Sequence, residues 1–428
     1  MRRRIEVDLL SRVEGTGALT IAVRDGRVEA VRLRIMEPPR LFEALLVGRG
    51  WEEAPDITAR ICGLCPVAYQ MSACQAMEAL AGVVVTPQIA ALRRLLYCGE
   101  WIASHCAHMF LLHLPDFLGF PDLMAMAREH GELVRRGLRM KRIGNALMRA
   151  IGGREIHPVN VRLGGFYRAP DESALRDLQP ELEWGLGAAL ETAAELGRLE
   201  FPALERDYEF VALRHHAEYP IVEGRIVSSR GLECPVEAFD QHIEEHQVPH
   251  STALRARIRG RGAYLCGPLA RINLNFDRLG GAAREAAARA GLRVPCTNPF
   301  KALLARAVEV TQAFEEALEL VRTYVPPRPA AVAPRPVDGV GAGATEAPRG
   351  LLWHRYEVDA AGRIRRARIV PPTAQNQAAM EEDLRELAPE LLHLDEAAAR
   401  QRAEWAVRNH DPCISCATHF LDLRVERR

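Results

Sequence analysis

Two C-x-x-C pairs stand at opposite ends of this chain, and no other feature constrains its fold as much. The pairs are Cys62/Cys65 in RICGLCPVAYQ and Cys413/Cys416 in DPCISCATH, with 347 residues between the inner cysteines. Two such pairs supply four thiolates, for which tetrahedral zinc is the default interpretation. Zinc ribbons, however, usually keep their pairs within roughly twenty residues of each other. Ligands drawn from both ends instead predict a centre buried in a large core.

The first pair has the sequence of a tight turn that leads into a helix. Gly63 permits the turn, and Pro66 suits the first helical position. A helix N-terminus lowers the pKa of nearby thiols, which favours the thiolate form that binds metal. The other six cysteines are scattered singly, and we expect them to be small buried hydrophobic residues.

Composition excludes several classes of protein. The 428 residues are 48% hydrophobic and 26% charged, as in a globular chain with a sizeable core. Basic and acidic residues balance at 56 each, so no net positive field favours nucleic acid. The sequence has no apolar run long enough for a membrane span and no signal peptide, and we therefore expect a cytoplasmic location.

The hydrophobic pattern predicts an α+β fold that is mostly α. Residues 4–36 alternate as an N-terminal antiparallel sheet with a turn at Asp25-Gly26, and residues 353–370 alternate as a small C-terminal hairpin. Between and after them, helical spacing predicts a bundle of long helices. The predicted helices cover 67–82, 88–115, 121–151, 171–200, 236–247, 299–324 and 377–409. We predict one domain over 1–428, with a sheet region (1–57), a helical core (58–324), a Pro/Ala/Gly-rich loop (325–347) and a C-terminal metal-site unit (348–428).

Further motifs occur in the order of a known family. They are RVEG (12–15), PRLFEALLVGR (39–49), SHCAH (104–108), IHPVNVRLGG (156–165) and APRG (347–350). With the two cysteine motifs, they resemble the large, catalytic subunit of nickel–iron hydrogenases over nearly the whole chain. RICGLCPVAYQ and DPCISC are most similar to the cytoplasmic, NAD(P)-linked members called sulfhydrogenases.

The resemblance implies a nickel–iron centre. Four thiolates would hold nickel, with Cys62 and Cys413 as terminal ligands and Cys65 and Cys416 as bridges to an iron that carries cyanide and carbon monoxide. Soft thiolates suit metals that change redox state. The implied reaction is the reversible, heterolytic cleavage of dihydrogen.

The resemblance also implies roles for residues around the metals. Glu14 matches a glutamate that relays the proton, Arg349 matches an arginine over the open coordination site, and Asp411 would pair with Arg349. The pocket of the iron's diatomic ligands would be lined by Pro348 and Leu352, with Thr373 hydrogen-bonded to a cyanide. A magnesium ion would be held by Glu43, His419 and the backbone carbonyl near Arg368.

One position departs from the commonest family pattern. A histidine usually stands four residues after the second cysteine, whereas this chain has Tyr69. A phenol still donates a hydrogen bond to sulfur but does not titrate near neutrality. The effect on tuning of the metals and on the response to oxygen stays open.

Some features of the sequence also fit other functions. HIEEH (242–246) fits the H-x-x-E-H zinc-peptidase pattern, but it lacks a third ligand, and we predict a solvated helix face. His105 and His108 are expected to be buried hydrogen-bonding residues. A structural zinc site remains an alternative for the cysteines. A non-catalytic scaffold related to the respiratory NADH–quinone oxidoreductase is the other, although that relative has lost the metal cysteines.

The chain lacks other iron–sulfur cysteine spacings, a G-x-G-x-x-G fingerprint and a flavin motif, so electrons must leave through other subunits. The implied partners are an iron–sulfur small subunit, a flavin subunit that exchanges electrons with NAD or NADP, and an iron–sulfur electron-transfer subunit. We also expect a maturation endopeptidase to cleave after His419 and to remove the tail 420–428. The sequence leaves the acceptor, the direction and any sulfur-reducing activity undetermined.

Overall fold

The computed structural model describes residues 2–418 and confirms the N-terminal antiparallel sheet. Its strands are β1 (Arg2–Val7), β2 (Gly17–Arg24) and β3 (Arg27–Ile35). Asp25 and Gly26 both have positive φ, 49° and 75°, in the tight turn between β2 and β3. Alternate residues such as Ile5, Ile21 and Leu33 form the buried face.

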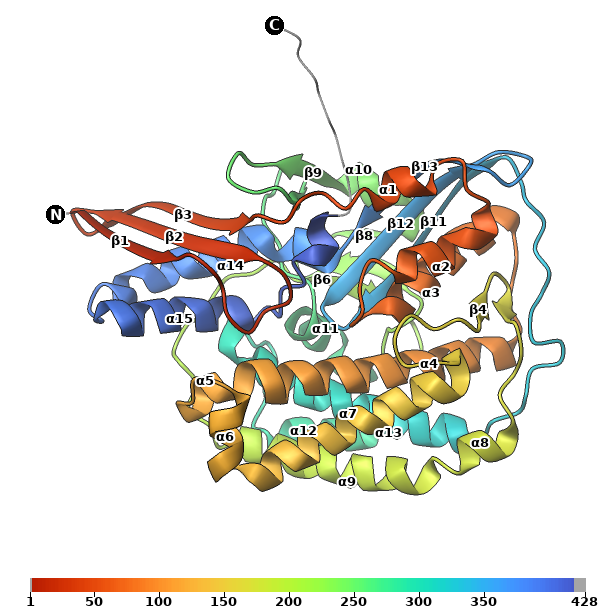
Figure 1. Ribbon diagram of the computed structural model, residues 1–428, viewed down its shortest axis with the longest axis horizontal. Coiled ribbons are helices and arrows are strands. Elements are labelled where there is room, and N and C mark those ends of the chain that lie inside the picture. The colour runs from red at the N-terminus through yellow and green to blue at the C-terminus, as the bar shows by residue number, and fades with distance from the viewer. Residues whose placement is uncertain (1, 419–428) are drawn as a thin grey trace, which may run out of the picture.

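This buried face packs against the last two helices of the chain (Figure 1). The helices are α14 (Pro372–Leu391) and α15 (Glu396–Arg408). The single helical stretch expected over 377–409 is therefore interrupted. Asp395 lies at the break and begins α15 by accepting a hydrogen bond from Ala398 N at 2.8 Å. The first and last parts of the chain thus share one hydrophobic cluster.

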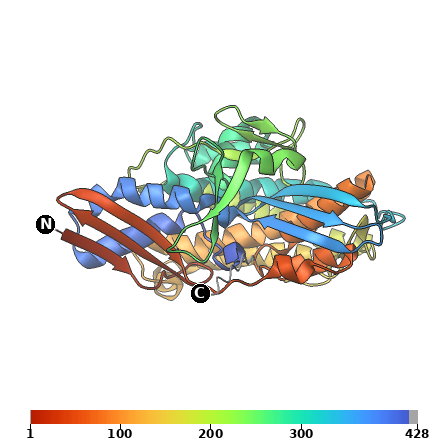
Figure 2. The same cartoon turned by 90° about the horizontal axis from the view of Figure 1, so that it is seen from above.

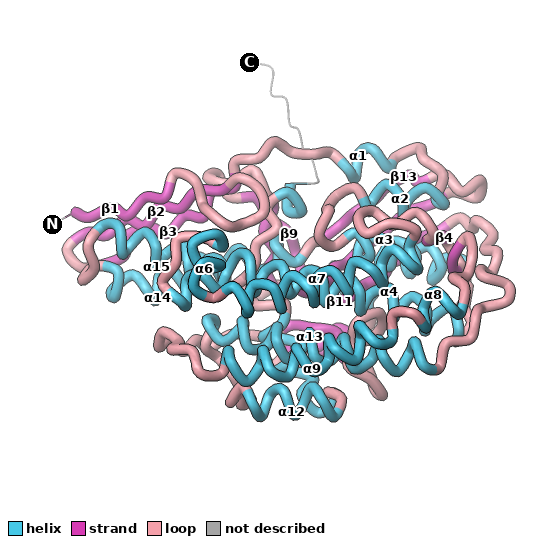
Figure 3. Tube along the Cα trace, turned by 60° about the horizontal axis from the view of Figure 1, so that its bottom comes forward, coloured by secondary structure: helices cyan, strands magenta, loops and turns pink. Residues whose placement is uncertain are grey.

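Four long helices form one bundle and run side by side in Figures 1 and 3, along the lower side of the molecule in the view of Figure 1. They are α4 (Pro87–Cys106), α7 (Gly131–Gly152), α9 (Gln179–Leu196) and α13 (Ala302–Arg322). A Cβ at Gly144 would lie 2.5 Å from Gly99 O, so these glycines permit the close contact of α4 with α7. The helix predicted over 88–115 continues from α4 as a π-helical turn, Ala107–His113, and α5 (Leu114–Leu118).

The shorter helices connect these elements. They are α1 (Phe42–Leu46), α2 (Ala54–Ala59), α3 (Pro66–Ala81), α6 (Leu123–Glu129), α8 (Glu172–Arg176), α10 (Phe239–His242), α11 (Pro268–Asn275) and α12 (Gly281–Arg289). Short 3-10 turns cover Trp51–Glu53, Val236–Ala238, Phe276–Arg278, Pro299–Lys301 and Ser415–Thr418. Among the described residues, no helix combines the length and the hydropathy that a membrane crossing requires.

A second three-stranded sheet corrects the loop that was expected over 325–347. Its strands are β11 (Gly339–Ala347), β12 (Gly350–Val358) and β13 (Ile364–Val370), and the predicted hairpin corresponds to β12 and β13. The expectation is wrong for 339–347, because the glycines there serve close packing and not a turn. A Cβ at Gly341 would lie 2.0 Å from Ala76 O of α3. Figure 2 shows this sheet at the opposite end of the molecule from β1–β3.

Only the first residue of the HIEEH segment is helical, so the prediction of a helix over 236–247 is wrong for 243–247. His242 ends α10, and β9 (Ile243–Gln247) pairs antiparallel with β10 (Leu254–Ile258). Ile243 is buried opposite Ile258, while Glu244 pairs with arginines of and just after β10. The remaining strands are β4 (Val161–Arg162), β5 (Gly165–Phe166), β6 (Val211–Arg214), β7 (Arg225–Ser228) and β8 (Glu233–Cys234).

Candidate metal centre

The first cysteine pair lies in the turn between α2 and α3, as the sequence predicts. Cys65 is the N-cap of α3, and Pro66 occupies its first position. Leu64 N lies 3.3 Å from Cys62 Sγ and donates to it across the turn. Both cysteines are buried, whereas Gly63 between them is exposed. The turn therefore directs the sulfurs into the protein.

The second pair follows α15 and is held by the N-terminal segment. Glu14 and Cys413 form an isolated parallel β-bridge, in which Ile414 N donates to Glu14 O at 3.0 Å. The Glu14 carboxylate accepts from Ser415 N at 3.1 Å. Thr373 Oγ1, at the start of α14, accepts from Cys413 N at 2.9 Å. Contacts from distant parts of the chain thus fix the backbone that carries Cys413 and Cys416.

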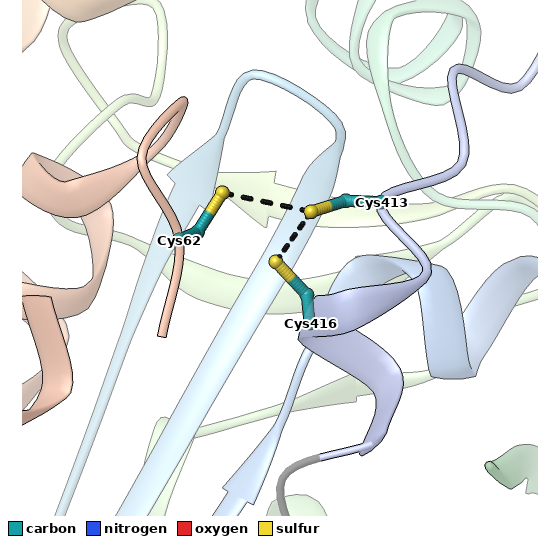
Figure 4. Close-up of side chains that lie close together, drawn as sticks. All are labelled: Cys62, Cys413 and Cys416. Carbon is teal, nitrogen blue, oxygen red and sulfur yellow. Dashed lines mark hydrogen bonds between the residues drawn. The ribbon is translucent and has the colours of Figure 1, made fainter. Parts of the chain in front are cut away.

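Cys62 of the first pair meets both cysteines of the second pair, as Figure 4 shows. Cys62 Sγ lies 3.5 Å from Cys413 Sγ, and Cys413 Sγ lies 2.6 Å from Cys416 Sγ. The three sulfurs lie within 4.8 Å of one another. Cys65 is outside this triplet, but it is buried and interacts with all three. All ten cysteines are free and buried, including the six single ones, which confirms their expected burial.

The chemistry of these thiols fits a bound metal. Burial raises the pKa of the Cys413 and Cys416 thiols, whereas the hydrogen bond with Cys413 lowers the pKa of Cys62. Several thiolates cannot share a small buried volume without a compensating cation. Soft sulfur donors select a soft or borderline metal, such as nickel, iron or zinc. The four cysteines therefore fit the group that the sequence implies.

A buried arginine lies close to the sulfurs. Arg349 is 4% exposed, and its Nε and Nη2 donate to Asp411 O at 2.7 Å and to Asp411 Oδ1 at 3.0 Å. The structure thus brings Arg349 and Asp411 together. Arg349 Nη1 has no hydrogen-bond partner among the described residues. Asp411 has a positive φ of 51°, and this left-handed conformation changes the direction of the backbone just before Cys413.

The other predicted residues around the iron lie in the buried core. Pro348 and Leu352 flank the turn from β11 to β12, and both are buried. Thr373 is 3% exposed, and because its oxygen accepts from Cys413 N, its hydroxyl proton is available for another acceptor. A mostly apolar lining would suit carbon monoxide, and the single hydroxyl donor would suit a metal-bound cyanide, whose nitrogen accepts a hydrogen bond.

Two of the three predicted magnesium ligands are neighbours. Glu43 of α1 accepts from Ile369 N at 2.7 Å, which places its carboxylate beside the backbone of Arg368 on β13. The Arg368 side chain points elsewhere and pairs with Glu245 at 3.1 Å. His419 lies outside the described residues.

Tyr69 occupies a buried position beside the sulfurs. It is 1% exposed, and its hydroxyl has no hydrogen-bond partner among the described residues. Burial and then the neighbouring thiols raise the pKa of Tyr69, so the phenol stays protonated. It is therefore a neutral donor where the commonest family pattern has a titrating imidazole.

Sequence reasoning missed Glu100. This α4 residue is fully buried and accepts hydrogen bonds from Val67 N at 2.6 Å and Ala68 N at 3.2 Å in the first turn of α3. Burial raises the pKa of Glu100. The carboxylate ties the helix that begins at Cys65 to α4. The signal that was overlooked is an acidic residue on the otherwise apolar face of a long helix.

Comparisons with known proteins agree with this geometry. The sequence model of the nickel-dependent hydrogenase family matches residues 40–135 and 280–419. The chain is 36% identical over 425 residues to the sulfhydrogenase 1 alpha subunit of Pyrococcus furiosus, with 98% of each chain covered. It is 27% identical over 475 residues to the beta subunit of the NAD-reducing hydrogenase HoxS of Cupriavidus necator, covering 98% of this chain and 96% of that one. A crystal structure of an NAD⁺-reducing NiFe hydrogenase in its H2-reduced state is similar with a TM-score of 0.86 and 28% identity, covering 97% of this chain and 99% of that one.

Proposed function

This chain belongs to the nickel-dependent hydrogenase family, and from that premise we propose how its residues carry out the reversible, heterolytic cleavage of dihydrogen as the catalytic subunit of a nickel–iron hydrogenase. One observation carries the proposal. Buried cysteines from both ends of the chain meet beside a buried, ion-paired arginine. A structural zinc site would not need such an arginine.

Cys62, Cys65, Cys413 and Cys416 would hold the nickel and the iron through their thiolates. When bound, the metal pair supplies the Lewis acidity and the redox capacity for cleavage of dihydrogen. Pro348 and Leu352 would exclude water from the cyanide and carbon monoxide ligands of the iron, and the Thr373 hydroxyl would donate to a cyanide. Glu43, His419 and the carbonyl of Arg368 hold a magnesium ion near the C-terminal cysteine pair.

Glu14 accepts the proton released at the centre and passes it outward. Its backbone is bonded to Ile414, and its carboxylate lies against Ser415 N, between the two cysteines of the second pair. The residue is only partly buried, so its carboxylate also has a route toward solvent. A carboxylate at this position can accept and release a proton, which an amide cannot.

Arg349 places a permanent positive charge beside the centre. Two hydrogen bonds to Asp411 fix the guanidinium, and Nη1 remains available to the reacting molecule. The charge polarises that molecule without itself titrating.

Electrons leave through partner subunits, because this chain has no second cofactor motif. We assign these as an iron–sulfur small subunit, a flavin subunit linked to NAD or NADP, and an iron–sulfur electron-transfer subunit, and the similarity to a subunit of an NAD-reducing hydrogenase supports the link to NAD. A cytoplasmic location and maturation by an endopeptidase complete the proposal.

Metal analysis after purification without oxygen tests the proposal. We expect nickel and iron in near-equal amounts, together with hydrogen–deuterium exchange into solvent. Zinc alone would instead support the structural alternative, and absence of metal would support the scaffold. When a ligand cysteine is replaced by serine, as in Cys416→Ser, the matched control is Cys74→Ser. Cys74 is a buried thiol that lies outside the cluster and contacts Arg162 O.

A further inference from the structure

A line of buried polar groups leads away from the metal centre behind Arg349. Asp411 contacts Arg349 through Oδ1, and its other oxygen, Oδ2, lies 3.3 Å from Arg306 Nη1 of α13. Arg306 is 1% exposed, and its Nε has no hydrogen-bond partner among the described residues. Burial lowers the pKa of Arg306 to about 10, which still leaves it charged at neutral pH. One carboxylate therefore orients two guanidinium groups.

The far end of the line is Glu309, one helical turn after Arg306. Its carboxylate accepts two hydrogen bonds from Arg271, both at 2.7 Å, and a third from Tyr219 Oη at 2.7 Å. Although burial opposes ionisation, Arg271 lowers the pKa of Glu309 to about 2. The arginine is held in turn by Glu346 at 3.0 Å. Glu309 is thus a charged and rigidly held acceptor.

His105 of α4 lies between Arg306 and Glu309. Its Nδ1 is 3.1 Å from Arg306 Nη1, and its Nε2 is 3.0 Å from Glu309 Oε2. Because arginine only donates, Nδ1 is the acceptor of the Arg306 bond, and the neutral ring carries its proton on Nε2. Nε2 faces Glu309 at ion-pair distance without forming a well-directed hydrogen bond. Burial lowers the pKa of His105 to about 4, so the ring is neutral. The contacts therefore select a single tautomer.

We propose that His105 and Glu309 are positioning residues that fix Arg349 over the metal centre through Arg306 and Asp411. Glu309 selects the tautomer of His105, and the Nδ1 lone pair of that tautomer orients the Arg306 guanidinium. Arg306 then attracts Asp411 Oδ2 as an ion pair at 3.3 Å without a hydrogen bond, so that Oδ1 and the backbone carbonyl of Asp411 remain directed at Arg349. The proposal rests on the proposed function of Arg349.

The test compares His105→Leu with His105→Gln in the metal-loaded complex. Leucine removes the acceptor for Arg306, whereas the planar amide of glutamine offers one acceptor and one donor, as the neutral imidazole does. In crystal structures, we expect the Arg349 guanidinium to shift by more than about 0.5 Å in His105→Leu and to keep its place in His105→Gln. An unmoved Arg349 in His105→Leu would overturn the proposal.

Turnover gives a second readout through a double-mutant cycle. His105→Leu should retain nickel and lower the rate of dihydrogen turnover by about a hundredfold, and His105→Gln should recover most of that loss. In an Arg349→Lys background, His105→Leu should cause no further loss, because the residue that it positions is already absent. Additive losses would show that His105 acts independently of Arg349 and would overturn the proposal.

If His105→Leu loses nickel or fails to fold, Glu309→Gln provides a second test of the same proposal. The amide keeps the volume but removes the charge that selects the His105 tautomer, so Arg349 should again be displaced in the crystal structure. The proposed function fails separately, when the wild-type complex shows no hydrogen–deuterium exchange or when Arg349→Lys retains the full rate. If Arg349 keeps its normal position in both His105→Leu and Glu309→Gln, the positioning role is refuted, whereas the proposed function is not affected.

Discussion

Asp116 of α5 connects the two ends of the chain, and its replacement by asparagine provides a quantitative test of how the site is held. The carboxylate makes two hydrogen bonds of 2.8 Å to Arg408 at the end of α15 and one of 2.5 Å to Arg12, two residues before Glu14. The side chains of Asp116 and Arg408 are 0% and 1% exposed. Asp116→Asn removes the negative charge and directs an amide donor at an arginine donor.

The expected loss is large because Arg12 and Arg408 then lose the buried carboxylate that they share, and Arg408 keeps only the more distant Glu404 at 3.8 Å. Breaking a buried ion pair costs about 3–5 kcal/mol. For 428 residues, the entropy of unfolding is about 0.9 kcal/mol/K, so the melting temperature should fall by about 3–6 °C. Nickel retention should fall as well, because Arg12 and Arg408 flank the segments that carry Glu14 and the second cysteine pair.

Scanning calorimetry of the assembled complex, with nickel analysis of the same samples, provides the measurement. The control is Asp277→Asn, since Asp277 makes a bidentate pair with Arg214 but its side chain is 54% exposed. An exposed pair contributes at most about 1 kcal/mol, so this control should melt within about 1 °C of the wild type. Equal shifts for the two variants would refute the argument that Asp116 is a buried link between the chain ends.

Four further predictions address the centre and the core. Glu14→Gln should retain nickel but slow hydrogen–deuterium exchange into solvent about a hundredfold, and unchanged exchange would remove Glu14 from the proton route. Cys416→Ser should abolish nickel retention while Cys74→Ser preserves it, and equal nickel contents would contradict the ligand assignment. The free energy of unfolding, measured by denaturant titration, should fall as pH decreases from 6.5 toward 4. Burial lowers the pKa of His105 to about 4 and also lowers the pKa values of His108 and His113. Over this pH range the unfolded chain therefore binds more protons than the folded chain, which favours unfolding. A stability that does not change with pH would contradict this. The intact mass of nickel-loaded protein should correspond to a chain that ends at His419, and a chain that ends at Arg428 would show that the site closes without proteolysis.

The sequence predicted what depends on local pattern or on motif. Alternation located β1–β3, β12 and β13, helical spacing located α3, α4 and α13, and the cysteine motifs located the centre. It failed where a distant partner determines the conformation. Residues 339–347 have a loop-like composition, yet they form β11. Their glycines allow this strand to pack closely against Ala76 of α3, where a Cβ would clash. Residues 243–247 have helical spacing, yet they pair with β10.

The positioning groups were invisible for the same reason. His105 was expected to be a buried hydrogen-bonding residue, but its partners, Arg306 and Glu309, are about 200 residues away in the chain. No single-sequence pattern relates residues at that separation. What the sequence does offer is a set of charged residues on apolar helical faces, which must find partners because burial of an unpaired charge is costly.

The separation of the cysteine pairs explains why so much of the protein serves to join its two ends. Cys62 and Cys413 are 351 positions apart, and closing a flexible loop of that length costs about 5 kcal/mol. If metal binding alone had to supply this free energy, the affinity of the site for metal would be reduced by several orders of magnitude. The Glu14–Cys413 bridge, the Arg12–Asp116–Arg408 cluster and the packing of β1–β3 on α14 and α15 close the loop before any metal binds. The same contacts place Glu14 and Asp411 beside the sulfurs, so closing the chain also brings together the carboxylate that we propose as the proton carrier and the carboxylate that holds Arg349.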